Sequence, residues 1–409
     1  MSHPLRLKHV LLSSTSGAWG NEATGEDTPV IRSTEIDSDG NLNARYAELR
    51  SLTASEKKQT ELRKGDLLVV KSSGSDTHLG KVGYVDEKSQ GMGFSNFLQR
   101  LRFPSVQYSR YYWYLLNSVY IKDQIRYLGT TTTGLQNITG NLLGELRIPK
   151  MEVSKQRKIV DFLDTETSAI DQVVRLRRIQ LDLLAERERA AIDRILISES
   201  DRKIPLSRLC RIQTGIVIDS GRNTEGHELR PYLRVANVKA DGLDLTDVKY
   251  TLVDRTLAKR TELRNGDVLM TEGGDIDKLG RGTLWSDEIA GCLHQNHIFA
   301  VRPGPHISGG YLALLTRTTL ARTYFEMTGT KTTKLASTSI SKILAFNVPL
   351  PPRNEQEQRV QAAEKELSEI SRLTTALNKQ IDLLIERRQA LIMAAVTGQL
   401  DAITTPTVH

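Results

Sequence analysis

Cysteine is scarce in this 409-residue sequence, and long apolar segments are missing. The two cysteines, Cys210 and Cys292, lie far apart and neither belongs to a Cys-x-x-Cys pair. This excludes a disulfide scaffold and a thiolate zinc site, and it favours a reducing cytosol. No apolar run approaches the ~20 residues of a membrane-spanning helix. The N-terminal segment MSHPLRLKHVLLSS has no long apolar core or small-residue cleavage site. We therefore expect a cytoplasmic protein without a secretion signal or membrane partner.

Motifs for catalysis and metal binding are also missing. The segment GSDTHLGK (74–81) has one residue too many between its glycines for a phosphate-binding loop. It is followed by Val82, where that loop needs a magnesium-binding Ser or Thr. His294 and His297 have no carboxylate or thiol cluster beside them in the sequence, so ordinary polar packing is the favoured interpretation. We expect no catalytic residue and no metal site in this chain.

The sequence does contain an internal repeat with a spacing of about 200 residues. The matching pairs are LRKGDLL (62–68) with LRNGDVL (263–269), THLGK (77–81) with DKLGR (277–281), GTTTT (129–133) with GTKTT (329–333), and LLAER (183–187) with LLIER (383–387). A repeat of this length indicates two copies of one structural unit, each a globular part followed by a helix. We therefore expect a molecule with pseudo-twofold symmetry.

The repeat predicts five segments: globular domains at 1–150 and 201–350, helical regions at 151–200 and 351–400, and a tail at 401–409. The formal net charge of +7 is concentrated in the globular segments, which carry +4 and +5, whereas residues 151–200 and 351–409 each carry −1. A basic surplus of this kind favours a polyanionic partner. The alternative is a charge that serves only solubility.

The globular segments have the pattern of mixed α/β domains. The expected strands are LLVVK (67–71), DVLMTE (267–272), VIRSTEI (30–36) and YLRVANV (232–238). Long polar, Gly-rich stretches separate them, at 13–28, 72–80, 214–230 and 273–282. Loops of this length in a compact domain are usually functional or disordered. Their recurrence at matching positions favours function.

The helical segments carry apolar residues in an alternating 3–4 spacing, which is typical of a coiled coil. The expected seam residues are Val160, Leu163, Ile170, Val174, Leu181 and Leu184 in the first helix and Val360, Leu367, Ile370, Leu377, Ile381 and Leu384 in the second. Two seams of equal length favour antiparallel pairing within one chain. The alternatives are packing on the adjacent domain, or pairing between chains. Asn354 with Glu357 resembles a capping box, and Gly398 is a natural helix stop. The expected fold class is α+β, with two homologous mixed α/β domains separated by an antiparallel coiled coil.

Taken together, these features resemble the specificity (S) subunit of type I restriction–modification systems, over essentially the whole chain. The first copy contributes GTTTTGLQNI (129–138) and RIPKMEVSKQRKIVDFLDTET (147–167). The second contributes GTKTTKLASTSI (329–340), NVPLPPRNEQEQRV (347–360) and ERRQALIMAAVTGQLD (386–401). The first helix begins with VSKQRK, where the second has the more acidic NEQEQR.

The resemblance implies a non-catalytic subunit that selects the DNA target of a multisubunit methyltransferase and restriction enzyme. Its two globular parts would be target recognition domains, each recognising one half of a split, asymmetric sequence in double-stranded DNA. Its helices would act as a spacer and dock two methyltransferase (M) subunits, and restriction (R) subunits would join through the complex. S-adenosylmethionine, ATP and Mg²⁺ would bind those partners. The alternatives are a DNA-binding scaffold outside restriction, and a stand-alone nuclease or methyltransferase.

Sequence recognition needs side chains that reach base edges, together with Lys and Arg that contact phosphates. The residues that fit are Arg32, Lys81, Thr131, Thr132, Thr133, Gln136 and Asn137 in the first copy and Arg234, Lys278, Arg281, Lys331, Thr332, Thr333 and Lys334 in the second. Each has a structural alternative. The threonines suit turns and caps, Lys81 and Arg281 suit a solvated hairpin end, and Arg32 and Arg234 suit ion pairs within the domain.

Overall fold

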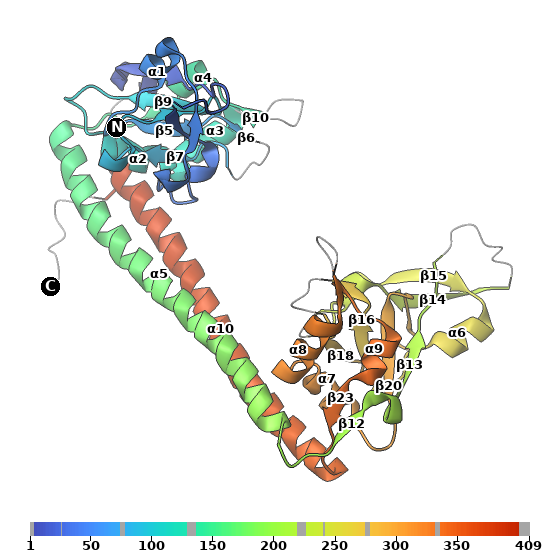
Figure 1. Ribbon diagram of the computed structural model, residues 1–409. Coiled ribbons are helices and arrows are strands. Elements are labelled where there is room, and N and C mark those ends of the chain that lie inside the picture. The colour runs from blue at the N-terminus through green and yellow to red at the C-terminus, as the bar shows by residue number, and fades with distance from the viewer. Residues whose placement is uncertain are drawn as a thin grey trace. The chain divides into compact units, whose positions relative to one another are not determined.

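The computed structural model describes residues 4–25, 27–73, 78–128, 136–218, 226–239, 242–274, 279–331 and 336–400. The chain divides into two compact units, which we call unit 1 (Met1–Arg177 with Lys379–His409) and unit 2 (Arg178–Asn378) (Figure 1). Each unit contains one globular part and portions of two long helices, α5 (Val153–Leu196) and α10 (Arg353–Val396). The five sequence segments given above stay a prediction.

The globular part of unit 1 is built on two small sheets. The four-stranded sheet has the order β2 (Ser13–Ser16), β9 (Leu98–Arg102), β5 (Leu67–Val70), β7 (Val82–Tyr84). The three-stranded sheet has the order β4 (Glu48–Arg50), β3 (Thr28–Ile31), β8 (Gly93–Phe94), and β3 and β8 are parallel. Two short pairs complete it: β1 (Leu5–Arg6) with β11 (Arg147–Ile148), and β6 (Ser72–Ser73) with β10 (Gln136–Asn137).

Unit 2 repeats this topology. Its four-stranded sheet has the order β13 (Cys210–Thr214), β20 (Ile298–Pro303), β16 (Val268–Thr271), β18 (Gly282–Leu284). Its main three-stranded sheet has the order β15 (Lys249–Val253), β14 (Glu228–Leu233), β19 (Leu293–His294). The remaining strands are β12 (Lys203–Pro205) with β23 (Asn347–Pro349), and β17 (Gly273–Gly274), β22 (Ala336–Ser337) and β21 (Thr330–Lys331). Every described strand of unit 2 except β21 has a counterpart in unit 1, which confirms the predicted duplication.

Short helices follow the same plan in both units. Unit 1 has α1 (Ala54–Thr60), α2 (Ser109–Asn117), α3 (Val119–Leu128) and α4 (Gly140–Gly144). Unit 2 has α6 (Arg255–Thr261), α7 (Gly309–Leu315), α8 (Thr319–Thr328) and α9 (Ile340–Ala345). The 3₁₀ turns are η1 (Leu7–Val10), η2 (Ser33–Glu35), η3 (Ala44–Tyr46), η4 (Glu87–Ser89), η5 (Leu206–Arg208) and η6 (Val235–Asn237).

The repeated L-R-x-G-D motif forms a turn that braces the central sheet. Gly65 and Gly266 have φ values of +88° and +89°, which glycine adopts without steric penalty. The next residue, Asp66 or Asp267, is buried and forms an ion pair with an arginine of the neighbouring strand: Arg102 at 2.6 Å and Arg302 at 2.7 Å, respectively. This part of the repeat therefore serves the fold.

Within each unit, α5 and α10 pack together and run antiparallel. In unit 1 the beginning of α5 contacts the end of α10, where Asp171 pairs with Arg388 at 2.8 Å. In unit 2 the end of α5 contacts the beginning of α10, where Arg194 pairs with Glu366 at 2.5 Å. The predicted antiparallel pairing within one chain is thus confirmed.

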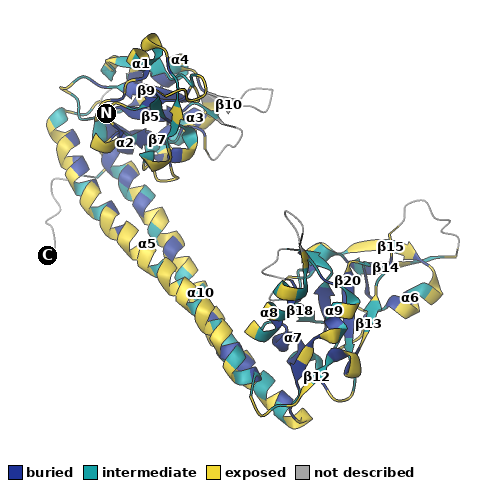
Figure 2. Ribbon diagram, in the orientation of Figure 1, coloured by how far each residue is buried: buried dark blue, intermediate teal, exposed yellow. Residues whose placement is uncertain are grey.

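The predicted seam residues all lie on the packed side of these helices. Six are buried: Val160, Leu163, Ile170, Val174, Ile370 and Ile381. The other six are half-buried: Leu181, Leu184, Val360, Leu367, Leu377 and Leu384. Figure 2 shows this alternation as a buried face along each helix, beside an exposed one. The 3–4 spacing located the packed face because residues three and four apart share one side of a helix.

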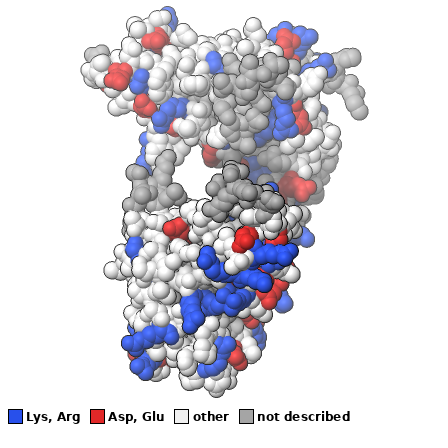
Figure 3. All heavy atoms as spheres, turned by 90° about the vertical axis from the view of Figure 1, so that its right-hand side faces the viewer, with Lys and Arg blue, Asp and Glu red and all other residues white. Residues whose placement is uncertain are grey.

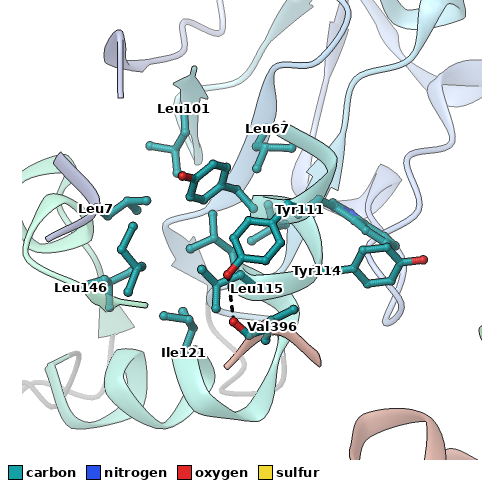
Figure 4. Close-up of a cluster of buried hydrophobic side chains, with 14 of the residues drawn as sticks. Leu7, Leu67, Leu101, Tyr111, Tyr114, Leu115, Ile121, Leu146 and Val396 are labelled. Atoms are coloured by element: carbon teal, nitrogen blue, oxygen red, sulfur yellow. Dashed lines mark hydrogen bonds between the residues drawn. The ribbon is translucent and has the colours of Figure 1, made fainter. Parts of the chain in front are cut away.

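The ends of the two long helices belong to the cores of the globular parts. Ile392 and Val396 of α10 pack in the core of unit 1 with Tyr111, Leu67 and Leu101 (Figure 4). Ile192 and Leu196 of α5 pack in the matching core of unit 2 with Tyr311, Val268 and Val301. Burial of these side chains fixes each helix end to its globular part.

Two local predictions were wrong. The alternation of VIRSTEI and YLRVANV is not a continuous strand, because β3 ends at Ile31 and β14 at Leu233 and each is followed by a 3₁₀ turn. The capping box at Asn354 is also wrong, because α10 begins at Arg353 and the carbonyl of Pro352 already accepts the bond from Gln356 N–H. Gly398 is a helix stop as predicted, with φ +75° just after α10 ends.

The glutamine shared by both helix starts is internal. Gln156 and Gln356 are buried, and each Oε1 accepts a bond from the backbone of the loop before α2 or α7: Tyr108 N at 3.1 Å and Ser308 N at 2.9 Å. The substitution of VSKQRK for NEQEQR therefore leaves this bond unchanged.

No helix in the described part of the chain is long and apolar enough to cross a membrane.

Candidate nucleic-acid interface

Two of the predicted contact segments emerge from one small sheet in unit 1. β6 precedes residues 74–77, β10 follows residues 129–135, and the two strands pair with Ser73 opposite Gln136. Ile138 N–H continues the contact by donating to the carbonyl of Lys71 at 2.7 Å. The strands β6 and β10, which border these two segments, therefore lie side by side although they are far apart in sequence.

Unit 2 anchors the corresponding segments in the same way. β17 precedes residues 275–278, and β21 and β22 flank residues 332–335. β22 is the central strand, with Gly273 opposite Ser337 and Thr330 opposite the same serine. We call the two small sheets, β6–β10 and β17–β22–β21, the loop roots of the units.

Half of the predicted contact residues lie outside the described part of the chain. These are Thr131, Thr132, Thr133, Lys278, Thr332, Thr333 and Lys334. The backbones of Gln136, Asn137 and Lys331 lie in β10 and β21, but their side chains are also outside the described part. Their contact with DNA stays a prediction.

Lys81 and Arg281 follow a tight turn that matches in both units. Leu79 and Leu279 are buried, and Gly80 and Gly280 have φ values of +75° and +77°. The turn leaves the next side chain half-exposed. Lys81 Nζ lies 3.5 Å from His78 Nδ1, which is too long for a strong hydrogen bond. A phosphate contact at these positions stays a prediction.

Arg32 and Arg234 form ion pairs within their own units. Arg32 bonds Glu35 at 2.9 Å and Glu48 at 3.0 Å, and the hydrogen bond to Glu35 raises the pKa of Arg32. Arg234 bonds Asp247 at 2.8 Å. Both arginines sit directly before a 3₁₀ turn. A bidentate contact with guanine would require them to exchange these partners.

Exposed cations on unit 2 were not selected from the sequence. Figure 3 shows Lys and Arg side chains gathered on one face of unit 2, the lower part in that view. The exposed cations on β13, β15 and α6 of unit 2 are Arg211, Lys249, Arg255, Lys259 and Arg260. They are scattered along 50 residues of sequence, so only the net charge of the segment could have indicated them. Cations of this kind suit phosphate contacts.

The two histidines singled out from the sequence have different environments. His294 is buried, and burial lowers its pKa to about 4. His297 is exposed, and its Nδ1 lies 2.6 Å from Glu272 Oε2, a carboxylate that the sequence places 25 residues away. Among the described residues no three His, Cys, Asp or Glu side chains are grouped as a metal site would need.

The long helices expose a second duplicated surface. In the LLAER and LLIER motifs the second leucine belongs to the seam, whereas the first is exposed: Leu183 by 58% and Leu383 by 55%. Glu186 and Arg187, like Glu386 and Arg387, are exposed beside them. Because these exposed apolar side chains recur at matching positions in both units, this surface is a candidate for protein–protein contact.

Comparison with known proteins identifies similar chains. The chain is 21% identical over 363 residues to the type I restriction enzyme EcoKI specificity subunit of Escherichia coli strain K12, covering 85% of this chain and 77% of that one. It is 23% identical over 189 residues to the putative type I restriction enzyme MjaX specificity subunit of Methanocaldococcus jannaschii. That second match covers 46% of this chain and less than half, 43%, of the relative. No protein-family profile matches the chain.

Solved structures give the same answer for the fold. A chain from a structural study of complex assembly and conformational transition in the type I restriction–modification system has a TM-score of 0.74 at 18% identity, covering 97% of this chain and 98% of that one. The chain has the fold of a type I specificity subunit. The crystal structure of the HsdS subunit from Thermoanaerobacter tengcongensis agrees, with a TM-score of 0.53 at 18% identity and 97% of each chain covered. The family resemblance seen in the sequence is therefore confirmed.

Proposed function

We propose that this chain is the DNA sequence-recognition subunit of a type I restriction–modification complex. Each unit would recognise one half of a bipartite, asymmetric target in double-stranded DNA. The observation that carries this proposal is the duplicated loop root. The larger sheets of the two units have the same strand order, and in each unit one small sheet borders two of the segments outside the described residues, but the side chains around these roots differ. One framework with two different sets of side chains is what two different half-sites require.

The helices would hold two methyltransferase subunits. Leu183 and Leu383 are exposed at matching positions, one in each unit, so two similar docking surfaces are expected. Restriction subunits would join through the complex. The chain itself would be non-catalytic, with S-adenosylmethionine, ATP and Mg²⁺ bound by the partner subunits.

The decisive experiment combines co-purification with sequencing of methylated DNA. The chain would be co-expressed with the methyltransferase subunit from the same genome, and the methylated sites mapped in those cells. We expect a stable complex and one split, asymmetric methylated sequence. Loss of that methylation when the chain is omitted would assign the recognition to it. A DNA-binding chain that forms no complex with a methyltransferase would instead favour a scaffold outside restriction.

The docking surface is tested separately. Leu183→Asp with Leu383→Asp should abolish co-purification of methyltransferase subunits while the chain stays folded, because both leucines are more than half exposed. Leu12→Asp is the matched control, since Leu12 is 65% exposed on the globular part of unit 1. Retention of both methyltransferase subunits by the double variant would exclude this surface.

A further inference from the structure

One matched position at the loop roots carries opposite charges in the two units. Lys71 lies between β5 and β6, and Glu272 lies between β16 and β17. Their backbones make the same bonds. Lys71 N–H donates to the carbonyl of Phe97 at 3.0 Å, and Glu272 N–H donates to that of His297 at 2.9 Å.

The carbonyl groups at this position also match. The Lys71 carbonyl accepts from Ile138 N–H at 2.7 Å, and the Glu272 carbonyl accepts from Thr338 N–H at 2.8 Å. Each residue therefore lies at a junction. The strand that follows it, β6 or β17, leads into one polar, Gly-rich stretch, and the residue bonded to its carbonyl, Ile138 or Thr338, follows the Thr-rich segment. Because the backbone framework is the same, the side chain is what differs between the units.

The side chains at this position are held but accessible. Lys71 Nζ donates to Ser16 Oγ at 2.5 Å, and partial burial lowers the pKa of Lys71. Glu272 is bonded to His297 at 2.6 Å, and these two side chains are 42% and 54% exposed. A side-chain pair this exposed contributes little to folding stability. The Glu272–His297 pair is therefore not needed to hold the sheet.

An exposed carboxylate at a DNA-binding surface has few favourable partners. Phosphate oxygens repel it, whereas the amino groups at base edges, N4 of cytosine and N6 of adenine, donate to it. A lysine at the same place has the opposite preference and donates to guanine O6 and N7. The two residues therefore suit base edges of opposite hydrogen-bonding character.

We propose that Lys71 and Glu272 are specificity-determining residues of the two half-sites. Glu272 accepts a bond from a base amino group in the half-site of unit 2, and His297 positions its carboxylate. Lys71 donates to a base acceptor at the corresponding place in the half-site of unit 1. This inference rests on the proposed function and names which chemistry each unit selects.

The test uses the complete complex with methyltransferase subunits and the methylated target mapped for the wild-type chain. Binding would be measured to that target and to all single-base-pair variants of both half-sites, over a series of salt concentrations. Glu272→Gln should reduce discrimination by about 5- to 150-fold at one base pair of one half-site, the range expected for a single base contact. Lys71→Gln should act in the same way on the other half-site only.

Two further variants separate base recognition from structural effects. Glu262→Gln is the matched control, because Glu262 is also part-exposed and ion-paired, with Arg230 at 2.5 Å. Glu262 lies near the opposite end of β20 from the Glu272–His297 pair. Its carbonyl accepts a hydrogen bond from Arg302 near the end of that strand, whereas His297 directly precedes its start. Glu262→Gln should leave discrimination unchanged. His297→Gln, which can still donate to Glu272, should retain more discrimination than His297→Phe.

The outcomes are distinct. Unchanged discrimination at every base pair in Glu272→Gln would overturn the inference. It would also be overturned if Lys71→Gln weakened binding to all sequences equally and made the salt dependence shallower, because that result marks a phosphate contact. In both cases the bipartite target of the wild-type complex, and with it the proposed function, would stand. Absence of a methylated target for the wild-type complex would overturn the proposed function and this inference together.

Discussion

The phenol oxygen of Tyr111 donates a hydrogen bond to the main-chain carbonyl of Val396, 2.8 Å away and 285 residues later in the chain (Figure 4). In unit 2 the same bond joins Tyr311 to the carbonyl of Leu196 at 3.2 Å. Burial raises the pKa of both tyrosines, so each keeps the proton that it donates. Each unit thus holds the end of one long helix with the same buried contact.

Removing this hydroxyl should loosen one helix end and leave the other intact. Tyr111→Phe leaves the Val396 carbonyl without its donor, which costs about 1–2 kcal/mol of local stability. Segment-resolved hydrogen exchange at 379–396 should therefore accelerate about tenfold. Tyr311→Phe is the matched control and should accelerate exchange at the end of α5 instead. Equal effects of both variants on both segments would contradict the local role of each bond.

The seam of the paired helices should tolerate no charge. Ile370 is 3% exposed, so Ile370→Asp buries an unpaired carboxylate and should lower the free energy of unfolding by several kcal/mol. Leu373, three residues later, is 50% exposed, and Leu373→Asp should change stability by no more than about 0.5 kcal/mol. Chemical denaturation of the full chain measures both. Similar losses in the two variants would contradict the assigned packed face.

Sequence reasoning reached the duplication and the packed faces because both depend on local signals. Glycines with positive φ recur in matching turns, and apolar residues recur at helical spacing. It missed the pair of Glu272 with His297, because the sheet joins strands that are distant in sequence. It could not decide whether Arg32 forms an ion pair within the unit or reaches guanine, because the position of Glu48 depends on β4. Net charge alone did not locate the cations of β13, β15 and α6.

The long helices carry opposite charges at one matched position, Arg388 in α10 and Glu188 in α5. We expect each side chain to be compatible only with the charges of its own unit. Arg388 of α10 is nearly buried in unit 1, 2.8 Å from Asp171 and 4.0 Å from Asp39. Glu188 of α5 pairs with Arg317 in unit 2. Arg388→Glu should therefore place like charges together and destabilise unit 1 by about 2–3 kcal/mol. Arg387→Glu, at the exposed neighbour, should have little effect.

A reversed pair provides the second half of this test. Arg388→Glu with Asp171→Arg should recover part of the lost stability, and Glu188→Arg with Arg317→Glu should do the same in unit 2. Thermal unfolding of the four single and two double variants measures the coupling. Strictly additive losses in both double variants would show that these charges do not discriminate between the helix ends.

Buried His294 should make the stability of unit 2 depend on pH. Its Nδ1 lies 2.8 Å from the carbonyl of Ile298 and therefore carries the proton of the neutral ring, and burial lowers its pKa from the ordinary 6.5 to about 4. As the pH falls, the unfolded chain therefore takes up the second ring proton at a higher pH than the folded chain does. The contribution of the neutral ring is fully present above pH ~6.5 and is lost progressively down to pH ~4, by at most about 3 kcal/mol.

His294→Gln removes the titrating group while retaining an amide that can donate to the carbonyl of Ile298. The variant should be less stable than the wild type at pH 7.5 because it leaves the packing imperfect, but its stability should fall less steeply between pH 6.5 and 4. Urea denaturation at a series of pH values measures the difference between the two curves. Parallel curves over this range would show that His294 is not the buried neutral base in unit 2.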